Sequence, residues 1–159
     1  MGKGKDGIYA KYIKRILDFT LSLIALIVLS PILLLLTVVG AIAMKGNPFF
    51  VQKRPGKIDP KTGKETTIKL VKFRTMTCEK DPQTGELLPD DQRLTQYGAF
   101  LRATSLDDTI GIVGCLGNSL SLVGPRPQLF RDLVFMTPEQ RRRHTVRPGI
   151  TGLAQVNGR

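Results

Sequence analysis

Two adjacent aspartates, Asp107 and Asp108, are the side chains of this sequence best suited to chemistry on a phosphate group. A carboxylate pair can hold Mg²⁺, or one of its members can attack as a nucleophile. Arg102, a few residues earlier, supplies a cation that could neutralise phosphate charge. A structural role is the alternative, because Thr104 and Ser105 are good helix N-caps and each precedes an aspartate by three residues, as in a capping box.

Arg126 is a second candidate, because it lies between two prolines, Pro125 and Pro127. Proline restricts the backbone on both sides of the arginine, so its guanidinium is presented in a defined direction. A planar guanidinium binds a phosphate through two parallel hydrogen bonds. The alternative is a tight turn that carries a solvated arginine.

A third candidate is the basic segment 141–147, which holds four arginines within seven residues. Such a cluster fits anionic headgroups or a nucleotide diphosphate, and the alternative is a solvated basic face. The glycine-rich segment that follows, 149–158, offers backbone donors and the side-chain amides of Gln155 and Asn157, which suit a nucleobase or a ribose. His144, the one histidine of the chain, favours a structural role.

Composition limits the class of protein and the kind of partner to which these candidate residues can belong. The chain has 159 residues and a net charge of +11, which calls for an anionic partner. A hydrophobic content of 42% excludes a disordered polar chain, and two cysteines exclude a disulfide scaffold and a cysteine-rich zinc module. Nucleic acid is disfavoured as the partner, because the sequence has no recognition-helix pattern, no zinc-ligand spacing and only 6% aromatic residues.

The candidate side chains must be positioned by larger elements, and the longest of these predicted from the sequence is apolar. Residues 19–44 form a run of 26 residues without a charge, whereas a membrane-spanning helix needs about 20. The run is too long for a signal peptide, whose apolar region has about 7–15 residues. Pro31 lies in its middle and lacks a backbone N–H, which predicts a kink or a break.

Both flanks of the apolar run are basic. The flanking cations are Lys3, Lys5, Lys11, Lys14 and Arg15 before the run, and Lys45, Lys53, Arg54 and Lys57 after it. The positive-inside rule draws both ends to the cytoplasm, so the segment would enter the membrane and turn back at Pro31. Each half would then be a helix of roughly 19 Å, too short to cross. Two models stay open: this re-entrant helix-break-helix hairpin, and a tilted, kinked spanning helix.

The remainder of the chain reads as a small domain held against the membrane. Residues 49–54 and 66–76 are predicted strands joined by the turn at 59–63, which makes a β-hairpin. Residues 94–103 are predicted to form a helix with Tyr97, Phe100 and Leu101 inward. The predicted fold class is α+β, with a basic segment and re-entrant membrane helix at 1–45. A cytoplasmic domain of hairpin, short helices and long loops follows at 46–159 and is expected to be truncated at its C-terminus.

Together these pieces resemble the bacterial sugar transferase family, the monotopic phosphoglycosyl transferases, over residues 14–159. The matching segments, in order, are KRILDF before the apolar run, QKRPG at 52–56, KLVKFRTM at 69–76, ELLPDDQRL at 86–94, LRATSLDD at 101–108, SLVGPRP at 121–127 and RPGITGLAQVNGR at 147–159. Their order, more than any one piece, carries the resemblance.

The resemblance implies a re-entrant membrane helix and a Mg²⁺-dependent enzyme at the cytoplasmic face of the bacterial inner membrane. The family transfers a sugar phosphate from a UDP-sugar to polyprenyl phosphate, releases UMP and starts a surface glycan pathway. Asp107 matches the nucleophile that forms a phosphosugar-aspartyl intermediate, and Asp107 and Asp108 match the metal-binding pair. The matches to substrate-binding positions are Lys72, Arg74, Arg102, Arg126, Arg147, Gln155 and Asn157.

The sequence departs from the family pattern at the pair itself. The family has Asp-Glu followed by Leu-Pro-Gln, whereas this chain has Asp108 in the Glu position and a β-branched, glycine-containing stretch, Thr109 to Gly114, after it. That stretch is poor helix material. The departure leaves an alternative function open: a weakly active or inactive relative that binds UDP-sugar or polyprenyl phosphate at the membrane.

Overall fold

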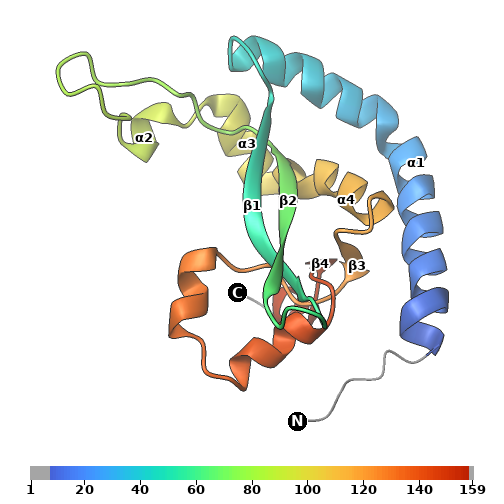
Figure 1. Cartoon of the computed structure of the whole chain (residues 1–159). Coiled ribbons are helices and arrows are strands. Elements are labelled where there is room, and N and C mark those ends of the chain that lie inside the picture. The colour runs from blue at the N-terminus through green and yellow to red at the C-terminus, as the bar shows by residue number, and fades with distance from the viewer. Residues whose placement is uncertain (1–7, 158–159) are drawn as a thin grey trace. The chain divides into compact units, whose positions relative to one another are not determined.

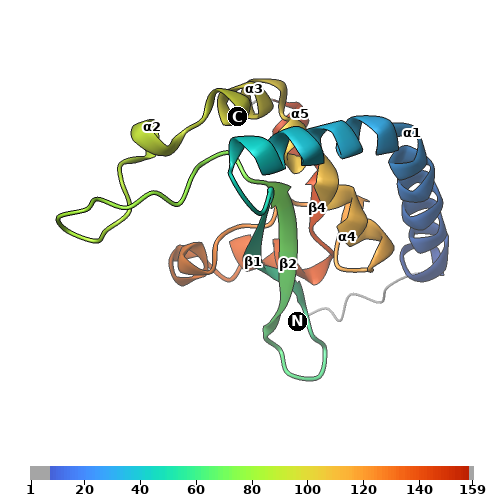
Figure 2. The same cartoon turned by 90° about the horizontal axis from the view of Figure 1, so that it is seen from above.

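The computed structural model describes residues 8–157 (Figure 1, and from above in Figure 2), so Lys3, Lys5 and the predicted C-terminal end at Arg159 lie outside the described residues. Helices and strands are mixed along the chain, which agrees with the predicted class. In chain order the elements are η1 (Tyr9–Ile13), α1 (Lys14–Ala43), β1 (Phe49–Ile58), β2 (Glu65–Phe73), α2 (Asp90–Arg93), α3 (Gln96–Thr104), η2 (Leu106–Ile112), α4 (Val113–Leu116), β3 (Ser121–Val123), η3 (Phe130–Phe135), η4 (Gln140–Thr145), β4 (Gly149–Thr151) and α5 (Leu153–Val156).

The apolar run lies in α1, a helix of 30 residues with Pro31 inside it. Only 17% of an 18-residue apolar stretch of α1 is buried, so its apolar side chains are exposed rather than packed in a core. This exposure makes α1 compatible with membrane insertion. Of the predicted kink or break at Pro31, the break is not present, since the helix continues through that residue. A proline removes one backbone donor, and a long helix can tolerate that loss as a kink.

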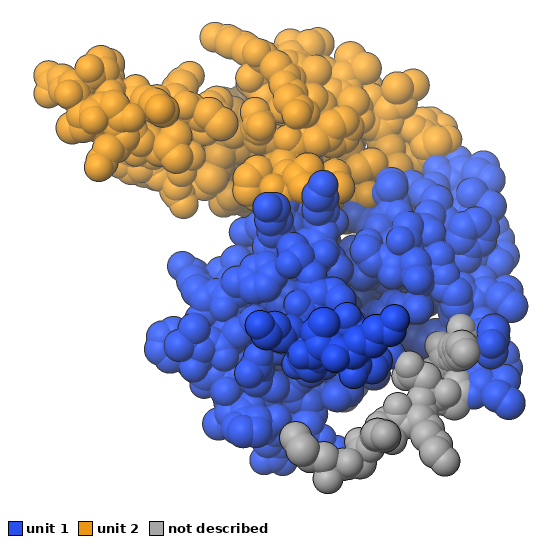
Figure 3. Space-filling model, viewed as in Figure 1, with its two compact units in different colours: residues 1–28, 52–70, 111–159 blue, residues 29–51, 71–110 orange. Residues whose placement is uncertain are grey.

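The described residues form two compact units (Figure 3), one within 8–28, 52–70 and 111–157 and one of 29–51 and 71–110. The chain passes from the first unit to the second inside α1, between Val28 and Leu29. The two strands of the hairpin also contribute to both units.

The first unit has a small apolar core. Its buried members are Ile68, Cys115 and Leu120, and Leu70, Leu122 and Ile150 pack against them. The short strand β3 pairs in parallel with β4, with Ser121 opposite Gly149. The glycine-rich segment 149–158 contains two elements that the sequence did not predict, β4 and α5. Their partners lie far away in sequence, so local patterning could not reveal them.

Polar side chains at the start of α1 fasten it to the first unit. Arg15 donates to the carbonyls of Cys115 and Leu116 at the end of α4. Asp18 is buried and accepts hydrogen bonds from the Ser121 hydroxyl at 2.7 Å and from the Leu122 N–H at 3.3 Å. This end of α1 is therefore tied to the protein by charge-assisted hydrogen bonds rather than by apolar packing.

The second unit packs α3 against the end of the hairpin and the second half of α1. Leu101 is fully buried, and the Tyr97 hydroxyl donates to the carbonyl of Leu36 at 2.8 Å. Gly40 allows this approach, because a Cβ there would lie 2.8 Å from the Tyr97 hydroxyl oxygen. The predicted strands and α3 are confirmed, but the inward position of Phe100 was wrong, since its side chain is 54% exposed.

Candidate active site

The carboxylate pair sits directly after α3, at a change of helix type. Ser105 has a left-handed backbone with φ of 56°, and the 3₁₀ helix η2 starts at Leu106 and carries Asp107 and Asp108 in its first turn. The capping-box interpretation fails for Thr104, whose hydroxyl donates to the Phe100 carbonyl at 2.8 Å instead of capping a new helix. Short, tight elements in place of a long α-helix agree with the poor helix propensity of the following residues.

Lys72 of β2 forms an ion pair with Asp108. The lysine side chain is 18% exposed and the aspartate side chain 39%, so the pair is partly shielded from solvent. Burial raises the pKa of Asp107, and the negative charge of Asp108 raises it further, while Lys72 and Arg102 act in the opposite direction. The two carboxylates therefore have different environments: one is paired with a cation, and the other is partly desolvated beside a like charge.

Arg102 and Arg74 approach this pair to different degrees. The Arg102 Nε donates to the Thr75 hydroxyl at 3.2 Å, which holds the guanidinium near the end of β2. Arg74 follows β2 by one residue, and its backbone N–H donates to the Pro48 carbonyl at 2.7 Å. Within residues 8–157, the Arg74 side chain has no recorded hydrogen bond or ion pair with either aspartate. The structure thus brings together Lys72, Arg102, Asp107 and Asp108 in the second unit.

The first unit holds a cavity of about 580 Å³ that Arg126 and Gln155 line together. The two residues meet because the β3–β4 pairing places the Pro-Arg-Pro turn beside the C-terminal segment. The Gln155 Nε2 donates to the Ile150 carbonyl at 3.1 Å, and its Oε1 is buried without a hydrogen-bond partner in the described structure. An unpaired acceptor in a cavity is suited to a ligand that donates hydrogen bonds.

Two residues of this cavity, Arg143 and Gln140, were not predicted individually. Arg143 donates to the Arg126 carbonyl at 3.0 Å, and its Nε is buried without a partner among the described residues. The basic cluster was visible in the sequence, but only the fold shows which arginine faces the cavity. Arg141 instead forms an ion pair with Glu65.

Arg147 and Asn157, both predicted to bind substrate, do not line this cavity. Arg147 precedes β4, and its carbonyl oxygen would lie 2.6 Å from a Cβ placed on Gly124, so its backbone packs closely against the residue that follows β3. Asn157 is exposed just after α5. His144 is buried, and its Nδ1 lies 3.3 Å from the Gly56 carbonyl oxygen. Burial lowers the pKa of His144, which fits the structural role expected for it.

The carboxylate pair suits a Mg²⁺ ion that is held only in part by protein side chains. Among residues 8–157, no group of three or more His, Cys, Asp or Glu side chains could form a closed metal cage. Mg²⁺ commonly uses one or two carboxylates, keeps several waters and takes its remaining oxygens from substrate phosphates. Asp107 and Asp108 match that pattern, with Lys72 already beside one Asp108 oxygen.

The chain thus combines an exposed apolar helix, compatible with membrane insertion, with a carboxylate pair that has cations beside it. The chain belongs to the bacterial sugar transferase family, whose model matches residues 9–159. This result confirms the family that the sequence motifs resemble.

Several proteins with assigned names are similar in sequence to this chain. The chain is 45% identical over 147 residues to an uncharacterized sugar transferase, EpsL, of Bacillus subtilis, covering 92% of this chain and 69% of that protein. It is 40% identical over 154 residues to a UDP-glucose:undecaprenyl-phosphate glucose-1-phosphate transferase of Klebsiella pneumoniae, and 36% identical to the enzyme so named in Escherichia coli. The matches cover 91% and 93% of this chain, but only 31% and 32% of those two longer proteins.

Proposed function

We propose that this chain transfers a sugar-1-phosphate from a UDP-sugar to a polyprenyl phosphate and releases UMP. The observation that carries the proposal is the Asp107–Asp108 pair with Lys72 and Arg102 around it, in a member of this family. The names of the relatives point to UDP-glucose and undecaprenyl phosphate as the first substrates to test. Exopolysaccharide production, named for the Rhizobium leguminosarum relative, is the corresponding pathway class.

In the proposed first step, a carboxylate oxygen of Asp107 attacks the phosphorus that bears the sugar. The new bond joins that oxygen to phosphorus, the bond from this phosphorus to the bridging oxygen of the diphosphate breaks, and UMP leaves with the bond electrons. In the second step, an oxygen of the polyprenyl phosphate attacks the same phosphorus and frees the Asp107 carboxylate. The product is a polyprenyl diphosphate sugar.

The surrounding residues have separate tasks in this scheme. Lys72 and Arg102 offset the charge of the diphosphate, so that a carboxylate can approach it. Asp107 and Asp108 would hold Mg²⁺, which would supply further charge neutralisation on the phosphate oxygens. Arg126, Arg143 and Gln155 line the cavity of the first unit, whose unpaired polar atoms suit a nucleotide. Arg74, Arg147 and Asn157 remain proposed substrate contacts.

The location that we propose is the cytoplasmic face of the bacterial inner membrane, with α1 entering the bilayer and returning to the same side. The exposed apolar surface of α1 supports its insertion, and the basic residues at both ends support the return. Pro31 would then mark the deepest point.

The decisive experiment measures UMP release from UDP-glucose and undecaprenyl phosphate with and without Mg²⁺. We expect Asp107→Asn to lower turnover by at least about 1000-fold, because an amide cannot replace the nucleophile. Asp91→Asn, at an exposed position of α2, is the matched control and should turn over like the wild type. Radiolabel from the sugar should remain on the wild-type protein without acceptor, and its absence together with active Asp107→Asn would contradict the covalent scheme.

One observation favours a second candidate, a relative that binds the substrates with little turnover. Asp108 stands where the family has Glu and is already paired with Lys72, which competes with a metal for its oxygen. Binding of UDP-glucose without UMP release, in a protein whose Asp108→Glu variant is equally inactive, would support this candidate.

A further inference from the structure

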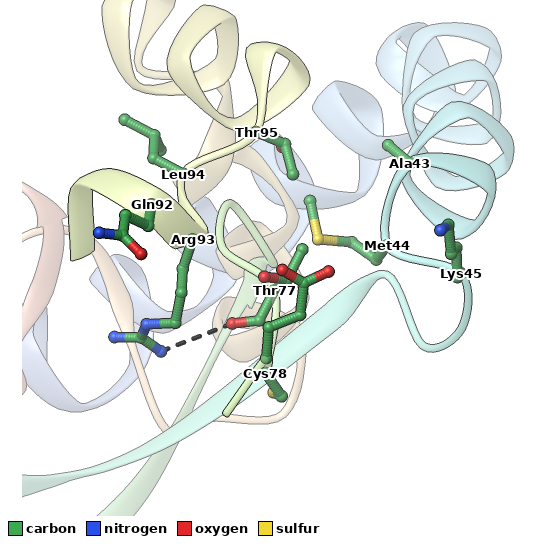
Figure 4. A pocket seen from close by; sticks show the side chains of 10 residues that line it. Ala43, Met44, Lys45, Thr77, Cys78, Gln92, Arg93, Leu94 and Thr95 are labelled. Atoms are coloured by element: carbon green, nitrogen blue, oxygen red, sulfur yellow. Dashed lines mark hydrogen bonds between the residues drawn. The ribbon is translucent and has the colours of Figure 1, made fainter. Parts of the chain in front are cut away.

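A second cavity, of about 490 Å³, lies in the unit of residues 29–51 and 71–110. It is formed by the C-terminal end of α1, the loop at 77–79 and the end of α2 with the residues after it (Figure 4). None of its lining residues belongs to the carboxylate pair, to the cations around that pair or to the cavity of Arg126. Its volume is in the range of small-ligand pockets, about 300–1,000 Å³.

Two polar atoms at this cavity lack partners. The Thr77 hydroxyl oxygen and the Arg93 Nε are buried, and neither has a hydrogen-bond partner in the described part of the chain. The rest of the Arg93 guanidinium is held, because Nη2 pairs with Asp90 and Nη1 donates weakly to the Thr77 carbonyl at 3.5 Å (Figure 4). Buried polar atoms are nearly always hydrogen-bonded, so two orphans lining one cavity point to an absent acceptor.

The charges around the cavity have both signs. Arg93 is already balanced by Asp90, which leaves Lys45 and Glu79 as the remaining charged lining residues. Both are exposed. A ligand with a single negative charge would gain from Lys45 and lose at Glu79. A zwitterion would satisfy both residues, with its anionic group toward Lys45, Arg93 and Thr77 and its cationic group toward Glu79.

The position of the cavity along the chain identifies the surroundings of its ligand. The charge-free run ends at Met44, and Lys45 is the first charged residue after it; both line the cavity. Whether α1 spans the membrane or returns, this point must lie where hydrocarbon gives way to headgroups. Ile42, which directly precedes the lining residue Ala43, is 73% exposed and offers an apolar surface to acyl chains.

We propose that this cavity binds the headgroup of an aminophospholipid, that is, a phosphate diester that also carries a primary ammonium group. The phosphate accepts hydrogen bonds from the Thr77 hydroxyl and the Arg93 Nε–H, with Lys45 nearby as a counter-charge. The ammonium donates to the Glu79 carboxylate, and the acyl chains lie along the exposed apolar face of the second half of α1. This site is independent of the proposed transferase reaction.

Cys78 provides the readout, because it lines the cavity and is exposed, whereas Cys115 is fully buried. The full-length protein is placed in nanodiscs of phosphatidylcholine alone, or with added phosphatidylethanolamine or phosphatidylglycerol. The rate of maleimide modification at Cys78 is then followed by peptide mass spectrometry. We expect phosphatidylethanolamine to slow the modification about tenfold, the effect of one added charge-assisted hydrogen bond, and the other two lipids to slow it less.

Variants separate the site from a general effect of lipid composition. Glu79→Gln should abolish the difference between phosphatidylethanolamine and phosphatidylcholine, while Glu86→Gln, at an exposed loop position outside the cavity, should retain it. Thr77→Val should weaken protection by phosphatidylethanolamine. Each ratio is taken within one variant, so altered thiol reactivity cancels. Equal protection by all three lipids, stronger protection by phosphatidylglycerol, or an unchanged preference in Glu79→Gln would overturn the proposal.

Discussion

At the scale of single residues, the two aspartates are chemically unequal although they are neighbours. Asp108 has a fixed cation beside it, Lys72, whereas burial and the Asp108 charge raise the pKa of Asp107. A carboxylate with a raised pKa is more basic than an ordinary aspartate and hence a better nucleophile once it is ionised. This difference supports Asp107 as the attacking group and Asp108 as the residue that positions cations.

We expect the short side chain of Asp108 to limit the rate of sugar-phosphate transfer. Its carboxylate reaches about 1.5 Å less far than that of Glu, and a misplacement of about 1 Å can cost on the order of 100-fold in rate. Asp108→Glu should therefore raise kcat with little change in KM for UDP-glucose, and Asp108→Asn should lower kcat. Melting temperatures of the same preparations serve as the control. If Asp108→Asn turned over like an active wild type, Asp108 would have no part in the reaction.

Arg143 and Arg142 form a natural pair for testing the cavity of the first unit. Arg143 lines it with an unpaired buried Nε, whereas Arg142 is exposed and outside it. Replacing Arg143 by Lys keeps the charge and loses the planar fork, so we expect KM for UDP-glucose to rise about tenfold. Arg142→Lys should leave KM unchanged. Equal KM values for both variants, measured by initial rates of UMP release, would remove Arg143 from the nucleotide-binding residues.

At the scale of elements, those whose signals lie within a few residues of one another could be predicted, and those formed by residues distant in the sequence could not. The hairpin and α3 were predictable because turn residues and alternation act within a few positions. The β3–β4 pair was not, since it joins Ser121 to Gly149, and neither strand exceeds three residues. For the candidate site, the sequence predicted the aspartates, Arg126 and Lys72, while the ion pair of Lys72 with Asp108 and the position of Arg143 at the cavity needed the fold.

Gly98 of α3 tests the packing that supports the carboxylate pair. A Cβ at this position would lie 1.9 Å from the Thr75 carbonyl oxygen, which is backbone and cannot easily move aside. We expect Gly98→Ala to lower the free energy of unfolding by about 1–3 kcal/mol or more. Gly117→Ala is the control, because its nearest neighbours are 3.9 Å away. Thermal unfolding in detergent should show a lower Tm for Gly98→Ala alone, and equal Tm values would show that α3 can shift.

At the scale of the whole molecule, α1 is the longest element that contributes to both compact units. Its first half is fastened by Arg15 and Asp18, and its second half by the Tyr97 hydrogen bond to Leu36. Pro31 follows the transition between the units by two residues. The ties at both halves of α1 and the proline between them support the re-entrant path that we propose for this helix.

The proposed re-entrant topology makes a prediction about both ends of α1. Ile8→Cys and Gly46→Cys, at exposed positions on either side of the helix and in a Cys78→Ser background, should both react with a membrane-impermeant maleimide only from the cytoplasmic side. Pro31→Leu restores the missing backbone donor and favours a straight helix long enough to span. In that variant the Ile8→Cys probe should become accessible from the periplasm while Gly46→Cys stays cytoplasmic. Periplasmic labelling of Ile8→Cys with Pro31 intact would instead establish the tilted, kinked spanning helix.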